Sequence, residues 1–383
     1  MITTRAAVLY QSGNTAPFAS TRPLVIEELA LDAPGPGEVL VAVASAGLCH
    51  SDLSVIDGNR PRVMPMVLGH EASGVVRATG PGVQEFAPGD HVIFAFVPSC
   101  RHCAPCTSGR AALCENGAQA NTAGTLLSGK RRFQSSAGAA FNHHLGVSAF
   151  SQYTVAAQES LVKIDPAVPL NIAALFGCAV MTGVGAVLNT AKVETGASVA
   201  VFGVGGVGLS TVMGARAVGA HPIIAVATQE RKLELAQRAG ATHTVRVGSD
   251  DPVVAIRTIT SGGAAYVFES VGDEQVLAQA YAATRRGGTT ITMGLPNPAK
   301  QLSISAVSLV AEERTLKGSY MGSCVPQRDI PRFLALYQSG ALPVELLFTR
   351  NIALDEINEG FDTLARGQAV RQIVTFLGDT CLL

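Results

Sequence analysis

The stretch that decides the fold is Val199-Ala-Val-Phe-Gly203-Val-Gly205-Gly-Val-Gly208. A short apolar run, expected to be a strand, ends in glycines spaced as GxGxxG, and a helix is expected from there to residue 218. In such an arrangement Gly203 allows a tight turn, Gly205 lets the backbone approach a diphosphate, and Gly208 lets helix and strand pack closely. The amino terminus of the helix then favours the bound anion. The stretch therefore predicts a dinucleotide-binding turn in an α/β domain.

After this turn, predicted strands alternate with predicted helices, which is typical of a parallel, doubly wound sheet. The predicted strands are 198–202, 223–227, 266–269 and 288–293, and the predicted helices between them include 230–239 and 274–283. Before the turn, short apolar runs such as 38–44 and 91–96 alternate with turns rich in proline and glycine. This pattern predicts a β-rich domain, which a last strand at 371–377 is expected to complete.

The composition fits a protein with a large buried core. The chain has 383 residues, enough for about two to three domains, with 48% hydrophobic and 15% charged residues. Lys and Arg number 28 and Asp and Glu 29, so the net charge of −1 does not indicate nucleic acid or a membrane surface as a partner. Two uncharged stretches, 170–191 and 195–215, are long enough to span a bilayer, but their asparagines and glycines favour buried core elements. A soluble α/β enzyme is the expected class.

Four of the eight cysteines form a compact motif, Cys100-x2-Cys103-x2-Cys106-x7-Cys114. Residues 1–11 lack the apolar core of an export signal, so we expect a cytoplasmic protein in which thiols stay reduced and bind metal. Four thiolates this close suit a closed, tetrahedral structural zinc site. An iron–sulfur cluster is disfavoured because the last interval is longer than that of the ferredoxin pattern.

A second candidate metal set is dispersed along the chain and consists of Cys49, His70 and Cys178. Each residue alone is a weak signal, because a lone cysteine in an apolar stretch usually belongs to the core. Together, two thiolates and an imidazole with an open fourth position describe a catalytic zinc that binds an alcohol oxygen. The remaining cysteines, Cys324 and Cys381, receive no role.

These motifs resemble those of the zinc-dependent, medium-chain alcohol dehydrogenases, and the resemblance covers essentially the full length of the chain. The matching stretches are 69–74 (Gly-His-Glu-Ala-Ser-Gly), 100–114, 182–186 (Thr-Gly-Val-Gly-Ala) and the glycine turn. The resemblance implies a GroES-like catalytic domain at 1–179 and 323–383 around a Rossmann domain at 180–322. It further implies two zinc ions per chain and reversible hydride transfer between a primary or aromatic alcohol or aldehyde and NAD(P). The long segment between Cys114 and Cys178 is like that of the class I and class III branch, which favours a homodimer.

The resemblance also assigns roles to individual residues. The dispersed set is matched to the ligands of the catalytic zinc, Glu71 to a nearby or transient ligand, and Asp52 to the carboxylate that orients His70. Ser51 matches the hydroxyl that accepts the alcohol proton, and Ser54 stands where some relatives have a relay histidine, so water is expected to carry the proton out. Matched to cofactor contacts are His50, Thr182, Gly203, Gly205, Gly206, Val207, Gly208, Met293 and Arg371, and matched to the substrate pocket are Phe96, His144, Leu145, Leu295 and Tyr320.

The end of the second strand bears on the choice of cofactor. An NAD site normally has an acidic residue there, about twenty residues after the glycine turn, to bind the ribose hydroxyls. Here the position holds Ala227, and no carboxylate repels a 2′-phosphate. Donors to such a phosphate are available in Thr228, Gln229, Arg231 and Lys232. The sequence thus slightly favours NADP over NAD. The alternative is that NAD still binds while Arg231 and Lys232 lie on a solvated helix face.

Three alternative functions stay open at this point. S-(hydroxymethyl)glutathione dehydrogenases have the same long segment between the cysteine motif and Cys178. In that branch, however, an arginine that binds the glutathione adduct stands where this chain has Ala118. The entrance to their substrate pocket is acidic, whereas the corresponding residues 59–62 here include two arginines. A zinc-finger regulatory or nucleic-acid-binding protein needs a basic patch around the cysteine motif, which offers only Arg101 and Arg110. A zinc-free quinone reductase is disfavoured because all seven matched ligands are present.

Overall fold

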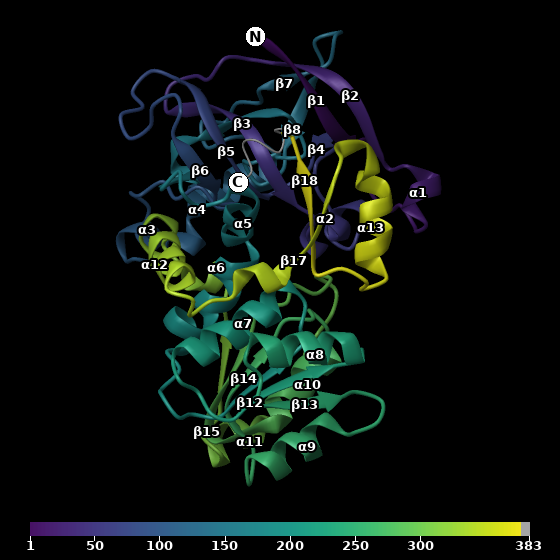
Figure 1. The fold of residues 1–383 in the computed structure, drawn as a ribbon, viewed down its shortest axis with the longest axis vertical. Helices are drawn as coiled ribbons and strands as arrows, with labels where there is room; N and C mark the ends of the chain where they lie inside the picture. Colours follow the sequence, from purple (N-terminus) through teal and green to yellow (C-terminus); the bar gives the residue numbers. More distant parts are fainter. Residues whose placement is uncertain (377–383) are drawn as a thin grey trace. The chain divides into compact units, whose positions relative to one another are not determined.

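The computed structural model describes residues 1–376, so Cys381 and residue 377 of the predicted last strand lie outside the described residues. The chain forms two compact units (Figure 1): the first contains Met1–Cys178, Val325–Pro331 and the described residues from Phe348, and the second contains Ala179–Cys324 and Arg332–Leu347. The sequence predicts 323–383 as part of the first domain, whereas Arg332–Leu347 belong to the second unit. They do so because the turn η6 (Val344–Leu347) packs against helices α7 (Gly206–Ala217) and α8 (Glu230–Ala239).

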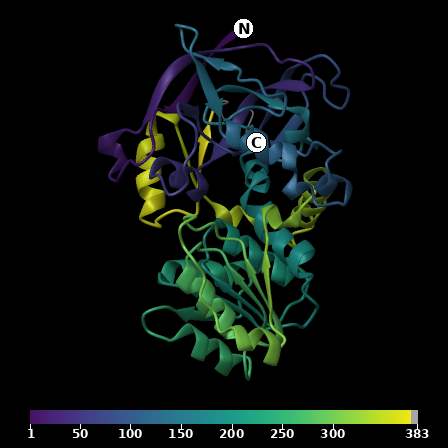
Figure 2. The same ribbon diagram turned by 180° about the vertical axis from the view of Figure 1, so that it is seen from behind.

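The second unit is built on a six-stranded parallel sheet, which confirms the predicted doubly wound class. The strand order is β13-β12-β11-β14-β15-β16, with the respective bounds His243–Arg246, Ile223–Ala227, Val199–Phe202, Ala264–Glu269, Thr284–Thr292 and Thr315–Gly318. Helices α7 and α8 contact each other, and α9 (Pro252–Ile259) contacts α10 (Glu274–Ala283); Figure 2 shows the same unit from behind. The strand order reverses between β11 and β14, and the carboxyl ends of the strands at such a reversal are where these sheets bind ligands.

The burial of the central strands explains their composition. Every residue of β11 and β12 is buried, so both faces of these strands are apolar, as expected for a parallel sheet covered on both sides. Their side chains join one core cluster with β14, which includes Phe202, Ile224 and Val267. The edge strands β13 and β16 were not predicted, because both are short, polar and largely exposed.

The first unit is β-rich, as predicted, and contains two sheets. A closed barrel has the order β1-β2-β7-β8-β4, with bounds Ile2–Leu9, Leu24–Leu31, Phe133–Gln134, Ala140–His143 and Met66–Val67. A seven-stranded sheet has the order β10-β6-β5-β3-β18-β17, with β9 also paired to β3; the bounds are Leu161–Ile164, His91–Phe94, Glu71–Thr79, Glu38–Gly47, Arg371–Thr375, Phe348–Ile352 and, for β9, Tyr153–Ala157. Ile373 of β18 pairs with Gly47 of β3, so the carboxyl-terminal strand does complete the first unit.

The first unit also contains the short helices α2 (His50–Ile56), α4 (Glu115–Ala123), α5 (Leu170–Ala174) and α13 (Ile357–Ala365), of which α5 packs against β3 and β5 and α13 packs against β18. Helix α12 (Pro326–Gln338) begins in the first unit and ends in the second. Among the described residues, no single helix has the length and composition to cross a bilayer, and only the bent pair Leu170–Gly177 and Ala179–Ala191 would meet that test together. Most of this apolar stretch is buried, including all of α6 (Ala179–Gly185).

Candidate active site

The dispersed metal-binding candidates of the first unit meet at one end of its seven-stranded sheet. Strands β3 and β5 are antiparallel, with Gly47 opposite Glu71. Cys49 follows the end of β3 and His70 precedes the start of β5, so both residues lie at the same edge. Cys178 follows η3 (Leu175–Gly177), which packs against β5. The strand register thus brings together three residues that are far apart in the sequence.

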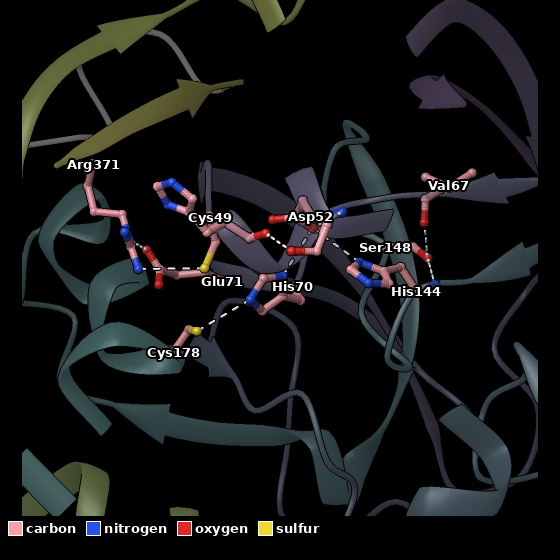
Figure 3. A network of polar contacts seen from close by, with 12 residues as sticks. Cys49, Asp52, Val67, His70, Glu71, His144, Ser148, Cys178 and Arg371 are labelled. Carbon is pink, nitrogen blue, oxygen red and sulfur yellow. Dashed lines mark hydrogen bonds and ion pairs between the residues drawn. The ribbon is translucent and has the colours of Figure 1, made fainter. Parts of the chain in front are cut away.

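The three side chains form a compact, buried donor set (Figure 3). The two sulfurs and a ring nitrogen all lie within 4.8 Å of one another. Nε2 of His70 is 3.3 Å from Sγ of Cys178, and each of the three residues is at most 5% exposed. Two sulfur donors and one nitrogen are the protein ligands of a known type of catalytic zinc site, so this set fits zinc.

The surroundings of Cys49 favour its thiolate. A hydrogen bond with Cys178 lowers the pKa of the Cys49 thiol well below its ordinary value, and the positive charge of Arg371 lowers it further. Burial opposes this shift but does not overcome it. A metal ligand must be a thiolate, and the polar groups around Cys49 therefore prepare it for that state.

Asp52 orients the imidazole of His70. Its Oδ1 lies 3.0 Å from Nδ1 of His70 and also accepts the backbone N–H of Gly69 at 3.3 Å. Burial would favour a neutral carboxyl, but the two neighbouring histidines hold the pKa of Asp52 well below its usual range. Burial likewise opposes a charged His70, yet the Asp52 carboxylate raises the pKa of His70 to about 10. The contact with Asp52 holds Nδ1 and turns Nε2 toward Cys178, which is the ring orientation that a metal-binding histidine requires.

His144 also contacts Asp52, which sequence reasoning did not anticipate. Its Nδ1 lies 3.2 Å from Oδ1 of Asp52, and its ring packs edge-on against His70 with centroids 5.5 Å apart. The backbone N–H of His144 donates to Ser148 Oγ, which in turn donates to the carbonyl of Val67, so the loop is fixed (Figure 3). Burial lowers the pKa of His144 against the opposing effect of Asp52, which favours a neutral ring.

Glu71 and Arg371 form a buried ion pair beside Cys49. Nε of Arg371 donates to Oε1 of Glu71 at 2.8 Å, and its Nη2 lies 3.6 Å from Sγ of Cys49. Both side chains are almost fully buried. Arg371 was matched to a cofactor contact from the sequence, and the structure places its guanidinium between Glu71 and the cysteine. Residues 300 positions apart make this contact, so no local pattern could predict it.

The remaining candidates of the first unit surround this cluster or lie next to it in the chain. His50 is exposed and Ser51 half-buried in the first turn of α2, and Ser54 Oγ donates to the His50 carbonyl at 2.9 Å. Phe96 is buried and packs edge-on against His70 with ring centroids 5.5 Å apart. Leu145 is buried at a residue with positive φ. The aromatic ring of Phe96 therefore borders the donor set at His70.

The four clustered cysteines form a second donor set in the first unit. Their sulfurs lie within 4.8 Å of one another around α3 (Ala104–Thr107) and the start of α4. Sγ of Cys114 accepts the backbone N–H groups of Cys100 and Gly117, both at 3.3 Å. Burial opposes ionisation of Cys100, but backbone N–H groups lower the pKa of its thiol to about 6. Four converging sulfurs, free of disulfides, fit a closed structural zinc site.

The glycine turn of the second unit has the shape that a diphosphate requires. Gly203 has a φ of +83°, in the left-handed region. A Cβ on Gly208 would collide with the carbonyl oxygen of Gly203, so α7 approaches β11 closely only because this residue is glycine. A Cβ on Gly205, in contrast, would meet no atom within 4 Å. The open space lies at the amino end of α7, and the turn therefore fits a dinucleotide phosphate.

Other predicted cofactor and pocket residues also belong to the second unit. Thr182 is buried in α6, which packs on α7, where Gly206 and Val207 form the first turn. Met293 is buried just after β15, with Sδ 3.8 Å from Thr211 Oγ1. Leu295, matched to the substrate pocket, is half-exposed, and Tyr320 is partly buried. These residues are therefore placed by the fold of the second unit alone.

The end of β12 lacks an acid, as the sequence indicates, and has basic residues around it. Ala227 is the last residue of β12, Gln229 precedes α8, and Lys232 is half-buried, which lowers the pKa of its ammonium group. Arg231 is exposed in the first turn of α8. Sequence reasoning missed Arg246, which ends the neighbouring strand β13 opposite Ala227. Arg246 was missed because the sequence did not predict strand β13.

Two family models match this chain in the same order as its two units. The first, described as an alcohol dehydrogenase GroES-like domain, matches residues 35–166, and the second, a zinc-binding dehydrogenase, matches residues 206–339. The chain belongs to the zinc-dependent, medium-chain alcohol dehydrogenase family and is an enzyme of that type. The match of both models argues against a zinc-finger regulatory protein.

Several characterised proteins and structures resemble the whole chain. An NDMA-dependent alcohol dehydrogenase of Amycolatopsis methanolica is 38% identical, covering 98% of this chain and 100% of that protein. An S-(hydroxymethyl)glutathione dehydrogenase of Paracoccus denitrificans is 36% identical, and the match covers 97% of this chain and 100% of that protein. The crystal structure of benzyl alcohol dehydrogenase from Acinetobacter calcoaceticus superposes with a TM-score of 0.91 at 33% identity. The match covers 98% of this chain and 100% of that chain.

Proposed function

We propose that this chain oxidises a primary or aromatic alcohol to the aldehyde, and catalyses the reverse reduction, with a nicotinamide cofactor. The observation that carries the proposal is the buried convergence of Cys49, His70 and Cys178, with Asp52 behind the imidazole. Such a set leaves one corner of a tetrahedron for the substrate oxygen. Family membership supplies the class of reaction, and this geometry supplies the residues proposed to carry it.

Each residue of the cluster has a distinct task in this proposal. Zinc held by the three ligands would supply a Lewis acid that lowers the pKa of the alcohol, and the nicotinamide would accept the hydride. Asp52 holds Nδ1–H of His70, which fixes the tautomer and leaves Nε2 for the metal. Arg371 holds Glu71 in place beside Cys49 and adds positive charge next to that thiolate.

The proton of the alcohol leaves through Ser51 in this proposal. Ser51 sits in the first turn of α2, two residues after Cys49, and its hydroxyl can both accept and donate a proton. The next position of the relay holds Ser54, whose hydroxyl donates to the carbonyl of His50. Because no imidazole is available at Ser54, water takes the proton from this point.

Apolar side chains near the donor set support an apolar alcohol as the substrate. Phe96 packs on His70, and Leu145 is buried near His144 in the chain. The similarity to benzyl alcohol dehydrogenase supports the same class. The glutathione adduct of formaldehyde is the competing substrate, supported by the Paracoccus relative, but Ala118 offers no positive charge for its carboxylates.

NADP is proposed as the preferred cofactor. Ala227 removes the carboxylate that would repel a 2′-phosphate, and Lys232 and Arg231 follow in the first turn of α8. The open space at Gly205 supports dinucleotide binding in either case. NAD stays the alternative, since the 2′-hydroxyl can also be bound by neutral donors such as Thr228 and Gln229.

Steady-state kinetics test the proposed function. Oxidation of benzyl alcohol and of S-(hydroxymethyl)glutathione is measured with NADP and with NAD. We expect the highest kcat/KM for benzyl alcohol with NADP. A higher kcat/KM for the glutathione adduct would assign the enzyme to the competing class, and no turnover of either substrate by the zinc-loaded protein would overturn the proposal.

We propose that the four clustered cysteines hold a structural zinc. Replacing Cys103 by serine should lower the zinc content from two ions per chain to one and lower the Tm by about 5 °C or more, because a structural zinc contributes directly to folding. Inductively coupled plasma mass spectrometry and calorimetry measure the two effects. The matched control is Ser108→Ala in the same exposed loop. A Cys103→Ser protein with full zinc content would rule out this site.

A homodimer is the proposed assembly, and helix α11 (Ala306–Ala311) offers a surface for it. Val307, Leu309 and Val310 on this helix are 70%, 40% and 82% exposed, an apolar group that is unusual on a free surface. Light scattering after gel filtration should give a dimer mass for the wild type. Val310→Glu should weaken dimerisation by at least about tenfold, because the interface would bury an unpaired charge.

The control for this prediction is Val254→Glu on α9, which changes an equally apolar residue that is 61% exposed. It should leave the dimer intact. A monomeric wild type, or a Val310→Glu variant as dimeric as the control, would contradict the proposed surface.

A further inference from the structure

Arg246 stands beside the position where the acidic residue is missing. Strands β12 and β13 are neighbours in the sheet (Figure 1). Arg246 is the last residue of β13, and in the parallel register it pairs with Ala227, the last residue of β12. The N–H of Val247 donates to the carbonyl of Ala227 at 2.9 Å, which fixes the two strand ends together. Register partners in a parallel sheet lie on the same face, so the Arg246 side chain shares a face with the Ala227 methyl group.

A contact with helix α8 shows where the guanidinium reaches. Nη1 of Arg246 lies 3.9 Å from Oε2 of Glu230, the first residue of α8. This distance is longer than a hydrogen bond, and both side chains are more than half exposed. An exposed ion pair of this kind is weak, so the guanidinium can leave it for a stronger partner. The guanidinium of Arg246 therefore lies near Glu230, which begins α8 and follows Ala227 by three residues.

We propose that Arg246 is a specificity-determining residue that binds the 2′-phosphate of NADP; the inference rests on the proposed use of this cofactor. In sheets of this kind the acid at the end of the second strand binds the ribose hydroxyls, and an arginine near that position accommodates a 2′-phosphate. A guanidinium binds a phosphate through two parallel N–H···O bonds, which neither Thr228 nor Gln229 can do. The absence of an acid at Ala227 and the arginine opposite it on the next strand therefore both favour a 2′-phosphate at this position.

Glu230 gives the proposal a second, independent consequence. Its carboxylate is the acidic partner of Arg246 among the described residues, so it competes with a phosphate for the same guanidinium. It would also repel the phosphate directly. Glu230→Gln should therefore strengthen binding of the phosphate while Arg246→Gln weakens it, and opposite signs at two contacting residues are not expected from a general loss of structure.

Isothermal titration calorimetry of the zinc-loaded protein with 2′,5′-ADP and with 5′-ADP tests the inference. The two probes differ only in the 2′-phosphate, and neither carries the nicotinamide, so the readout does not depend on catalysis. The wild type should bind 2′,5′-ADP more tightly than 5′-ADP. Arg246→Gln should weaken binding of 2′,5′-ADP about 10- to 100-fold, the usual range for a lost charged hydrogen-bond partner, and change 5′-ADP by less than about twofold.

Three variants serve as controls. Arg246→Lys should retain part of the preference for 2′,5′-ADP, because it keeps the charge without the two parallel bonds. Glu230→Gln should raise the affinity for 2′,5′-ADP alone. Arg238→Gln removes the same charge from the last turn of α8, about 12 Å along the helix from Glu230, and should change neither affinity.

The outcomes separate the inference from the proposed function. A wild type that prefers 2′,5′-ADP while Arg246→Gln keeps the full preference would overturn the role of Arg246 and leave NADP use intact. Equal binding of both probes by the wild type would overturn the inference together with the proposed NADP preference. Turnover of benzyl alcohol with NAD in that case would still support the proposed alcohol oxidation.

Discussion

Replacing Cys178 by alanine should remove one of two zinc ions and nearly all alcohol oxidation. The residue contributes one of two sulfurs to the buried donor set with Cys49 and His70. A Lewis-acidic metal contributes several kcal/mol to stabilising the transition state, and each 1.4 kcal/mol is about tenfold in rate, so kcat/KM should fall by at least about 1000-fold. Zinc content by mass spectrometry and initial rates with benzyl alcohol measure both effects on the same sample.

The matched control is Cys324→Ala. Cys324 is also a fully buried cysteine, but its sulfur lies near the carbonyl of Met181 in the second unit and belongs to neither donor set. This variant should keep two zinc ions and most of its activity. Asp52→Asn should have a smaller effect on zinc binding than the loss of a ligand. It keeps all three ligands but weakens the contact that orients His70, so zinc affinity should fall about 10- to 100-fold. A Cys178→Ala protein with two zinc ions and normal rates would contradict the assignment.

Replacing Arg371 by methionine should destabilise the first unit by about 3–5 kcal/mol, because the change leaves the Glu71 carboxylate buried without its partner. The expected size follows from the nearly complete burial of both side chains and from the 2.8 Å contact between them. Urea unfolding of the zinc-loaded protein at neutral pH, followed by circular dichroism, measures the change in the free energy of unfolding.

A double variant separates the loss of the ion pair from the loss of packing. Arg371→Met combined with Glu71→Gln removes both charges, so it should recover a large part of the lost stability. Glu71→Gln alone should be destabilising, because Arg371 then lacks its carboxylate. If the double variant were less stable than Arg371→Met by the full cost of Glu71→Gln, the two residues would be energetically independent and the proposed pairing would be wrong.

The sequence predicted the central elements of the second unit well. Helices α8 and α10 have the predicted bounds because local signals end them: Gly240 follows α8, and Asp273 caps α10 by accepting the N–H groups of Gln275 and Val276. The central strands were found because full burial makes them continuously apolar. Strands β13 and β16 were missed because an edge strand keeps polar side chains in water, so its pattern does not differ from that of a loop.

The two metal sites differed in how far the sequence could predict them. The motif 100–114 is local, so the spacing of its cysteines alone predicted that four sulfurs converge. The dispersed set could be proposed only from its residue types and from the family resemblance, because no local spacing joins its members and only the β3–β5 register and the position of η3 bring them together. The contacts of His144 with Asp52 and of Arg371 with Glu71 join distant parts of the chain, and neither was predicted.

The assignment of Arg246 depended on the same kind of information. Its residue type and position in the sequence suggest only an exposed arginine. The register of β12 and β13 places it opposite Ala227, and the absence of an acid at Ala227 gives that placement its meaning. The sequence alone favours NADP through Ala227, but strand pairing, which a single sequence does not show, was needed to propose Arg246 as the residue that binds the 2′-phosphate.

Anomalous diffraction at the zinc edge, from crystals of the protein as purified, tests the central claim most directly. We predict two zinc peaks per chain, one within the four clustered cysteines and one at the dispersed set. The second should lie about 2.3 Å from the sulfurs of Cys49 and Cys178 and about 2.0–2.1 Å from Nε2 of His70. The absence of zinc between these three residues, in protein that oxidises alcohols, would contradict the account.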